Sequence, residues 1–338
     1  MHHQQQDKTF YIATANLLNL ALPNRSYYAN AAPYTLSQYQ HKRQGLTQLL
    51  SNARADVIAT QEVWDEDCLI DLAQSLGFES YHVLAPLASN HINSDYTQGK
   101  GAQETPAVGL ISRFEVLDWH VLETIDPLAV ISIPDDGVYE RFNRPPLVAT
   151  LSIYGQEVTV ISAHLKSKRP HYLRDAEGNR LEDYDDPTIR IRAKLRSLCM
   201  RAAEAAAIRL FIIKTLYKTN HPLILLGDMN DVTDSVTTQL MAESSEVIYD
   251  KSMRDVALFD AARVQTSYGW TKDVAYTHLY QGMPEVIDQL FVSEEFLRDS
   301  KFSLGEVLRV DYFNDHLKWD YNQRVTDHGI VRAKLKLL

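Results

Sequence analysis

The stretch Leu223–Asp231, LILLGDMND, determines how we interpret the fold. Its continuous apolar run predicts a strand buried on both faces, which requires covering layers. Asp228 and Asn230 follow the run at its carboxyl end, where open α/β sheets bind their ligands. Residues i and i+2 of an extended chain point the same way, so both side chains could face one ligand. A turn that merely favours Asp and Asn is the alternative interpretation.

Outward from this stretch, strand and helix patterns alternate along the chain. A hairpin signal at Tyr154 and Gly155 adds antiparallel pairs, so we predict an α/β fold with mixed sheets rather than a purely parallel one. The predicted strands are Phe10–Ala15, Val57–Thr60, Val108–Ser112, Pro146–Ile153, Val158–Ala163, Leu223–Leu226, Val286–Val292 and Gly329–Leu335. The predicted helices are Ser37–Asn52, Asp65–Leu76 and Pro187–Tyr217.

The length of 338 residues fits one α/β domain, which we place at residues 9–338 after a flexible N-terminus at 1–8. No internal repeat or low-complexity linker divides the chain. Loops longer than about 12 residues are usually functional. The predicted polar loops are Pro23–Tyr34, Ser89–Gln103, Ile125–Asn143, Lys166–Asp186, Gln265–Tyr276 and Asp311–Thr326.

The composition excludes several classes of protein. A net charge of −10 argues against a surface that is cationic throughout, although a local basic mouth remains possible. Cys68 and Cys199 form neither a disulfide framework nor a zinc-ligand spacing, and both fall in predicted helices. There is no signal-peptide pattern, and no window approaches the roughly 18 apolar residues of a membrane span. We expect a reduced, soluble, cytoplasmic protein with no obligate protein partner.

Acidic side chains also follow other predicted strands. Glu62 lies near the end of ADVIATQEV and is a suitable hard oxygen ligand for Mg²⁺, although a solvated or capping glutamate would look the same. Asp327 and His328 precede the last predicted strand, in TDHGIVRAKL. A carboxylate beside an imidazole could coordinate a metal or stabilise developing negative charge, and a pair that only caps the strand is the alternative.

Two further segments place polar groups against apolar runs. His164 follows the strand in VTVISAHLKSK and, with Lys166 after it, could bind a phosphate, although a satisfied core histidine is commoner. Asp288 interrupts the apolar run VIDQLFVS and needs a partner, for which a histidine is the obvious candidate. Asn16 closes the first strand, and Arg144 precedes the strand that begins PPLVATL.

The order of these elements resembles the endonuclease/exonuclease/phosphatase superfamily, which has the DNase I-like fold. The resemblance covers about Thr9 to Leu337, and its GD-x-N, ID-x-x-x-V-S and DH motifs are jointly very specific. It implies a four-layer α/β sandwich of two packed mixed β-sheets flanked by helices, with the site at one end. It also implies an Mg²⁺- or Mn²⁺-dependent phosphoesterase in which an activated water attacks phosphorus in line.

The resemblance implies a metal site as well. Glu62 would be the principal ligand, with Asn16 and Asp327 near the metal. Some nucleases of the family carry an acidic residue two positions after the first Asn, where this chain has Leu18. This departure favours one tightly held ion.

The remaining roles concern water and phosphate. Asp228 would position or deprotonate the attacking water, Asn230 would contact the phosphoryl oxygens, and Asp288 would orient His328. The scissile phosphate would be bound by His164 and Arg144. Lys166, which follows His164, is a further candidate for binding the substrate phosphate. His164 stands where apurinic-site repair members carry Asn, which favours the DNase I, sphingomyelinase and deadenylase-like branches.

The substrate stays open between two classes. A nuclease acting on DNA or RNA is the preferred hypothesis, because basic residues gather in segment 166–196 (Lys166, Lys168, Arg169, His171, Arg174, Arg190, Arg192, Lys194, Arg196). A solvated helix face, partly neutralised by nearby acids, is the alternative interpretation of that segment. The second hypothesis is a phosphatase or phosphodiesterase for an inositol phosphate, a phospholipid head group or a nucleotide, closed over by loop aromatics (Tyr96, Tyr139, Trp270, Tyr276, His278). A non-catalytic binding module is disfavoured, since every acidic and imidazole position is present.

Overall fold

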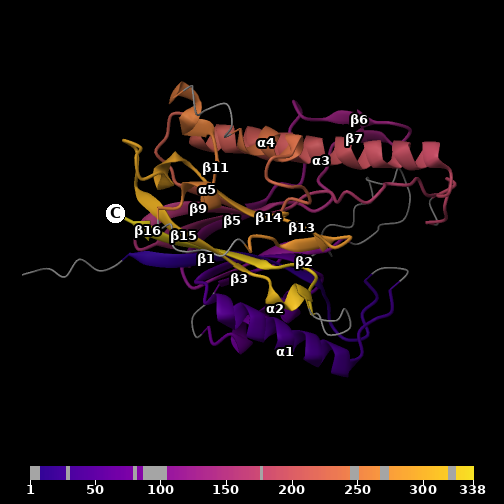
Figure 1. The fold of residues 1–338 in the computed structure, drawn as a ribbon, viewed down its shortest axis with the longest axis horizontal. Coiled ribbons are helices and arrows are strands. Elements are labelled where there is room, and N and C mark those ends of the chain that lie inside the picture. The colour runs from indigo at the N-terminus through magenta and orange to yellow at the C-terminus, as the bar shows by residue number, and fades with distance from the viewer. Residues whose placement is uncertain are drawn as a thin grey trace, which may run out of the picture.

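The computed structural model describes residues 8–27, 31–78, 82–86, 105–175, 178–243, 251–266, 274–318 and 325–338 (Figure 1). The predicted flexible N-terminus (apart from residue 8), the predicted loop 89–103 and positions 267–273 lie outside these residues, as do Tyr96 and Trp270.

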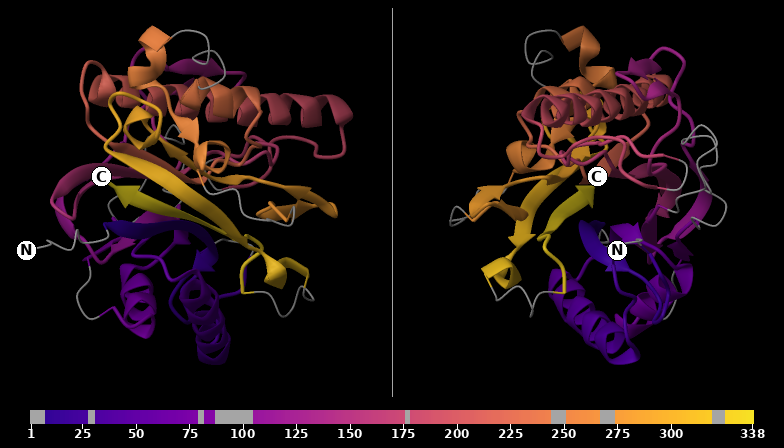
Figure 2. Two further views of the ribbon diagram at one scale, coloured as in Figure 1. Left: turned by 60° about the vertical axis from the view of Figure 1, so that its left-hand side comes forward. Right: turned by 90° about the vertical axis from the view of Figure 1, so that its right-hand side faces the viewer.

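Two six-stranded sheets pack face to face, with helices on both outer sides (Figures 1 and 2). The order in the first sheet is β15 (Gly305–Phe313), β16 (Ile330–Leu337), β1 (Thr9–Leu20), β2 (Val57–Val63), β4 (Ala107–Ser112) and β3 (His82–Leu84). The order in the second is β11 (Phe259–Asp260), β14 (Asp288–Val292), β10 (Leu223–Asp228), β9 (Gln156–His164), β8 (Leu147–Ile153) and β5 (Glu115–Val121). Both sheets are mixed, because β1–β2 and β9–β10 are parallel pairs and their other pairs are antiparallel.

The helices form the two outer layers, so the predicted four-layer sandwich is confirmed. Figure 1 shows α1 (Leu36–Ala53) and α2 (Glu66–Ser75) against the first sheet, and α3 (Pro187–Leu216) and α4 (Val236–Ala242) against the second. A capping box between Thr35 and Gln38 starts α1, and the Asp186 carboxylate caps α3. No helix in the described part of the chain has the length and apolar composition needed to cross a membrane.

Smaller elements complete the chain. Two hairpins are β6 (Ile131–Ile133) with β7 (Gly137–Tyr139), and β12 (His278–Tyr280) with β13 (Met283–Glu285). The short helix α5 (Ala261–Val264) follows β11, and 3-10 turns lie at η2 (Lys251–Val256), η3 (Glu294–Phe296) and η4 (Asp315–Lys318).

Each layer boundary has its own apolar core, and strand alternation decides which side chains enter it. Ile224 and Leu226 of β10 face the first sheet, whereas Leu223 and Leu225 face α3. Both faces of the apolar LILL run are therefore buried against other layers. The same alternation also aims Asp228, two positions after Leu226, into the space between the sheets.

Several boundaries differ from prediction. Segment 125–143, predicted as a loop, contains the β6–β7 hairpin, and segment 311–326 begins inside β15 and continues through η4. The strands β5 and β15 were not predicted at all. The first strand extends to Leu20, and Asp288 opens β14 rather than interrupting it.

Candidate active site

Three site residues form one row across the second sheet. Asp228 at the end of β10 pairs in register with His164 on β9 and with Asp288 on β14. Residues in register share a face, and this face points between the sheets. Sheet geometry alone therefore brings together a histidine and two carboxylates that are far apart in sequence.

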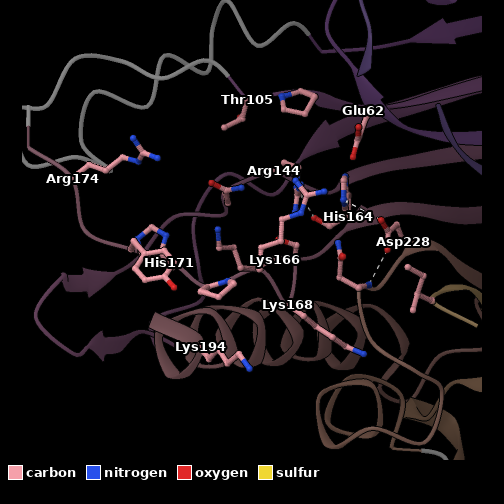
Figure 3. Close-up of a pocket in the computed structure, with 18 of the residues that line it drawn as sticks. Glu62, Thr105, Arg144, His164, Lys166, Lys168, His171, Arg174, Lys194 and Asp228 are labelled. Atoms are coloured by element: carbon pink, nitrogen blue, oxygen red, sulfur yellow. Dashed lines mark hydrogen bonds and ion pairs between the residues drawn. The ribbon is translucent and has the colours of Figure 1, made fainter. Parts of the chain in front are cut away.

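Asp228 is the centre of the site, and almost none of it is exposed (1%). Its Oδ2 atom accepts from Asn16 Nδ2 at 3.1 Å and lies 3.2 Å from His164 Nε2 (Figure 3). Its Oδ1 atom accepts from the Asn230 backbone N–H at 2.8 Å. Burial alone would raise the pKa of Asp228, but His164 and His328 hold it well below its ordinary value. Asp228 is therefore an ionised carboxylate, better suited to orienting a water than to keeping its proton.

His328 forms a buried pair with Asp288. The distance from His328 Nδ1 to Asp288 Oδ2 is 2.8 Å, and His328 Nε2 lies 3.9 Å from Asp228 Oδ2. Burial would lower the pKa of His328, but Asp288 and Asp228 raise it well above its ordinary value. The Thr277 hydroxyl accepts from the Asp288 backbone N–H and so fixes the start of β14. The arrangement holds an imidazolium in a fixed orientation between two carboxylates.

His164 differs from His328 in charge. Burial lowers its pKa, and the nearby Arg144 guanidinium lowers it further, so the ring is neutral. Since Asp228 can only accept, Nε2 carries the proton and Nδ1 is left as an acceptor. No hydrogen-bond partner for Nδ1 lies within the described residues. In this arrangement the one donor of His164 is directed at Asp228.

Glu62 reaches the site through an irregularity in β2. Along a regular strand Glu62 would face α1, because Ala59 faces the other sheet and Ile58 faces the helices. A register shift between Thr60 and Val63 and a φ of 62° at Glu62 turn the side chain. The carboxylate then accepts from the Asn19 backbone N–H at 2.9 Å and from Asn16 Nδ2 at 3.4 Å. A left-handed φ at a non-glycine residue costs about 1–3 kcal/mol and is typical of functional positions.

The donor groups fit a hard divalent cation. Glu62 and Asp327 line the same cavity, and within the described residues nothing donates to the buried Oδ1 of Asp327. Carboxylate oxygens with open coordination positions suit Mg²⁺ and Mn²⁺. Asp228, Asp288 and His328 also offer ligand atoms within 4.8 Å of one another. An imidazolium has no free lone pair, so His328 could bind a metal only after losing the proton that Asp288 and Asp228 stabilise. The better candidates are therefore Glu62 and Asp327, with Asn16 beside them.

A large cavity of about 1100 Å³ opens from this cluster. Figure 3 shows Glu62, His164 and Asp228 at one end, Arg174 at the other, and Arg144 and Lys166 between them. The Arg144 guanidinium donates to the backbone carbonyls of His164 and Leu165 at 3.3 and 2.6 Å, and Asn230 Nδ2 donates to the latter at 2.9 Å. Burial, together with Arg144, lowers the pKa of Lys166 to about 8. Arg144, Lys166 and Asn230 all line the cavity.

The basic segment 166–196 divides into two groups. Lys168, Arg192 and Arg196 are neutralised by carboxylates, and the prediction that Arg196 belongs to a basic surface is wrong because its side chain is fully buried. Arg169, Arg190 and Lys194 are exposed and line the cavity. Among the residues described, none of these three forms an ion pair. About half of the predicted basic segment therefore remains available to an anion.

Lys42 is a residue that sequence patterns did not single out. Its ammonium group is buried and donates to the Val325 carbonyl at 2.8 Å, beneath the segment that carries Asp327. Burial lowers the pKa of Lys42 to about 8, although Glu62 and Asp327 act in the opposite direction. A lysine in a predicted amphipathic helix looks like any exposed lysine, so no local signal could have found it.

The loop aromatics that were predicted to close over a small ligand occupy different places in the structure. His278 lines the cavity, and its ring centroid is 5.4 Å from that of His328. Tyr139 was predicted to close over a ligand, but it is buried and its hydroxyl donates to Glu204 at 2.6 Å. Glu204 also accepts from the Lys166 backbone N–H at 2.6 Å. Tyr139 therefore helps to hold the cavity wall from behind.

The fold and this cluster define a member of the endonuclease/exonuclease/phosphatase family. The family model matches residues 13–328, so the chain belongs to this family, as the resemblance predicted, and it is a phosphoric ester hydrolase. No curated protein sequence matches the chain.

Several solved structures share the fold. An endonuclease/exonuclease/phosphatase from Bacteroides vulgatus has 16% identity and a TM-score of 0.55 over 98% of this chain and 99% of that chain. The human Nocturnin catalytic domain with bound sulfate has 12% identity and a TM-score of 0.56, over 98% and 96%. A Bacteroides thetaiotaomicron mannosyl-6-phosphatase has 14% identity and a TM-score of 0.56, over 96% and 99%. At such identities the likeness extends to the fold alone.

Proposed function

We propose that the chain is a metal-dependent nuclease that hydrolyses phosphodiester bonds of DNA or RNA. The observation that supports this proposal is the cavity, which runs from Asp228 to cations of α3 that have no acidic partner among the residues whose structure is described. Its volume of about 1100 Å³ exceeds the usual 300–1,000 Å³ of a small-ligand site. Arg169, Arg190 and Lys194 lie along it beyond the scissile-phosphate candidates Arg144 and Lys166. An extended polyanion would use all five cations.

The proposed mechanism assigns water and phosphate to different residues. Asp228, held as a carboxylate, accepts a hydrogen bond from the attacking water and orients it in line with the leaving oxygen. The free N–H of the Asn230 amide and the guanidinium of Arg144 bind the phosphoryl oxygens. His328, kept cationic by Asp288, stabilises the negative charge that develops in the transition state.

A metal ion fits beside these groups. Glu62 and Asp327 would hold one Mg²⁺ or Mn²⁺ ion, with Asn16 orienting Glu62 through its 3.4 Å hydrogen bond. When bound, such an ion polarises a phosphoryl oxygen and neutralises the leaving oxygen. Lys42 balances part of the charge of the two carboxylates while the site is free of metal.

The competing function is hydrolysis of a small phosphoester. Asp135, Asp136 and Glu285 also line the cavity, and the last two pair with His171 and Lys168 of the cavity wall, which favours a ligand with few charges. Salt dependence separates the two functions. A strand held by several phosphate contacts loses affinity steeply as salt rises, with a slope of about 0.7 per contact for single strands, whereas one phosphate group responds weakly.

The test measures KM for DNA, RNA and a panel of phosphomonoesters over a salt series with Mg²⁺ or Mn²⁺. We expect nucleic acid turnover, and R190A/K194A should reduce the slope by about 1.4. The control K218A/K301A removes two exposed lysines that do not line the cavity and should keep the wild-type slope. Turnover of a phosphomonoester alone, with a flat salt response, would reject the nuclease in favour of the small-substrate enzyme.

A separate experiment tests the proposed hydrolytic mechanism itself. Replacing Glu62 or Asp228 by Ala should abolish metal-dependent hydrolysis of bis-p-nitrophenyl phosphate. A wild-type protein that hydrolyses no phosphoester with either metal would rule out the mechanism as a whole.

A further inference from the structure

Where it is described, the segment between His164 and α3 has almost no regular secondary structure, yet it is firmly anchored. Arg196 of α3, with a side chain that is 0% exposed, donates to both oxygens of Glu182 at 2.8 and 2.9 Å and to the His171 carbonyl at 3.2 Å. Glu182 in turn accepts from the Leu173 backbone N–H at 2.8 Å. A buried arginine with this many partners fixes the segment as a rigid wall of the cavity.

A second set of backbone contacts folds the segment back on itself. An antiparallel bridge joins Arg174 to Arg180, and the Leu181 N–H donates to the Leu173 carbonyl at 3.1 Å. This doubling brings Tyr172 and Tyr184 together from positions twelve residues apart. Their ring centroids are 3.8 Å apart and their planes differ by 21°.

An arginine extends this stack on one side. The Arg180 guanidinium carbon lies over the Tyr184 ring, 4.1 Å from its centroid. One face of Tyr184 is already covered by Tyr172, so the guanidinium must lie on the opposite face. The order is therefore Arg180, Tyr184, Tyr172, and the outer face of Tyr172 ends the stack.

The stack belongs to the catalytic cavity. Both tyrosines line it together with Asp228, and both remain partly exposed. The Arg196–Glu182 pair already anchors the segment to α3. The same cavity is lined by Arg169, Arg190 and Lys194. Sites for single-stranded nucleic acid have this composition, because bases stack on aromatic rings and phosphates bind to cations.

We propose that the outer face of Tyr172 is a stacking site for an unpaired base of a single-stranded nucleic acid whose phosphates lie along Arg169, Arg190 and Lys194. This inference rests on the proposed nuclease function and makes it more specific. It predicts a preference for single strands over duplexes, because a base inside a duplex has no free face. It also predicts that the stacked base lies at a fixed distance from the cleaved bond, since the wall is rigid.

The first test places 2-aminopurine at successive positions of a short single-stranded oligonucleotide, in EDTA so that the strand stays intact. Stacking quenches its fluorescence, and we expect strong quenching at one position with the wild-type protein. Tyr172→Ala should lose the quenching and raise KM about 5- to 100-fold, whereas Tyr172→Trp should keep both properties. Tyr217→Ala removes an exposed tyrosine at the far end of α3 and should behave as wild type.

The second test needs no variant, so misfolding of Tyr172→Ala cannot obscure the result. A single abasic position is moved along the same strand, and the wild-type KM should rise only where the base that stacks is missing. Three results would each overturn the stacking site while leaving the nuclease function intact, provided that the wild type cleaves nucleic acid. These are quenching that does not depend on position, a KM that no abasic position raises, and an equal KM for duplex and single strand. A wild type that neither binds nor cleaves nucleic acid overturns both.

Discussion

Replacing Asp288 by Asn isolates the charge that keeps His328 cationic. The amide oxygen of Asn can still accept from His328 Nδ1, now at 2.8 Å from the carboxylate, so the ring keeps its orientation. Only the negative charge is removed. The Thr277 hydroxyl, which accepts from the backbone N–H of residue 288, is untouched.

The size of the effect follows from the geometry. Unit charges about 3–4 Å apart attract by about 4–5 kcal/mol at an effective dielectric constant of about 20. Without this attraction the pKa of His328, now raised well above its ordinary value, should fall back toward it. The ring would then lose its charge at a lower pH than in the wild type, and kcat at pH 8 should drop about 10²-fold or more.

The assay follows hydrolysis of bis-p-nitrophenyl phosphate from pH 5.5 to 9 at saturating metal. We expect the activity of Asp288→Asn to recover partly as the pH falls, because acid restores the imidazolium, whereas the wild type needs no such recovery. The matched control is Asp260→Asn on the neighbouring strand β11, where Asn can still cap α5. A folded Asp288→Asn protein with wild-type kcat at pH 8 would refute the role assigned to the pair.

Three further changes test the site and its support. Glu62→Gln should lower activity about 10²-fold and raise the Mg²⁺ concentration needed for half-maximal rate, with metal affinity measured directly by calorimetry. Gly227→Ala should cost about 3 kcal/mol or more in urea unfolding, because its Cβ would lie 1.9 Å from the Ala163 carbonyl oxygen, whereas Gly155→Ala meets no atom within 4 Å and should cost about 1 kcal/mol. Burial raises the pKa of Glu295 to about 7 from 4.5, so folding stability should fall between these pH values and stay reduced above them. Glu295→Gln should therefore gain about 3 kcal/mol at pH 8 and nothing near pH 4.5, and a parallel pH dependence in both proteins would contradict this.

The central strand and its catalytic row could be predicted from sequence for a physical reason. A run such as LILL is apolar on both faces only when layers cover both sides of the sheet, and the polar residues at its end must then lie at an edge. The position of Asp228 and Asn230 at the edge of the sheet could therefore be predicted. The need of Asp288 for a histidine partner also followed, because a carboxylate in an apolar strand needs a partner. The choice of His328 as that partner came from the family resemblance.

Two of the longer strands that escaped prediction, β15 and β5, carry irregularities. In β15 a register shift between Val307 and Arg309 breaks the alternation of apolar and polar residues. In β5 a similar shift lies between Val116 and Asp118, and this edge strand leaves Trp119 45% exposed. A pattern with a period of two cannot follow a strand across such a shift.

The exposure of charged residues could not be predicted for a different reason. Arg190 and Arg196 look alike in sequence, but only the first is exposed, because Glu182 and Asp135 pair with the second. Such pairings depend on distant segments that meet only in the folded chain. The same holds for Lys42, whose partner is the carbonyl of residue 325.

The contact between Thr326 and Asn16 has a consequence for synthesis. The Thr326 hydroxyl donates to the Asn16 carbonyl at 2.7 Å, across a sequence separation of 310 residues. At about 5–20 residues per second, a ribosome needs about 15–60 s to translate the distance between them. Throughout that time the growing chain lacks Asp327 and His328, so the site cannot be assembled until nearly the whole chain has been made.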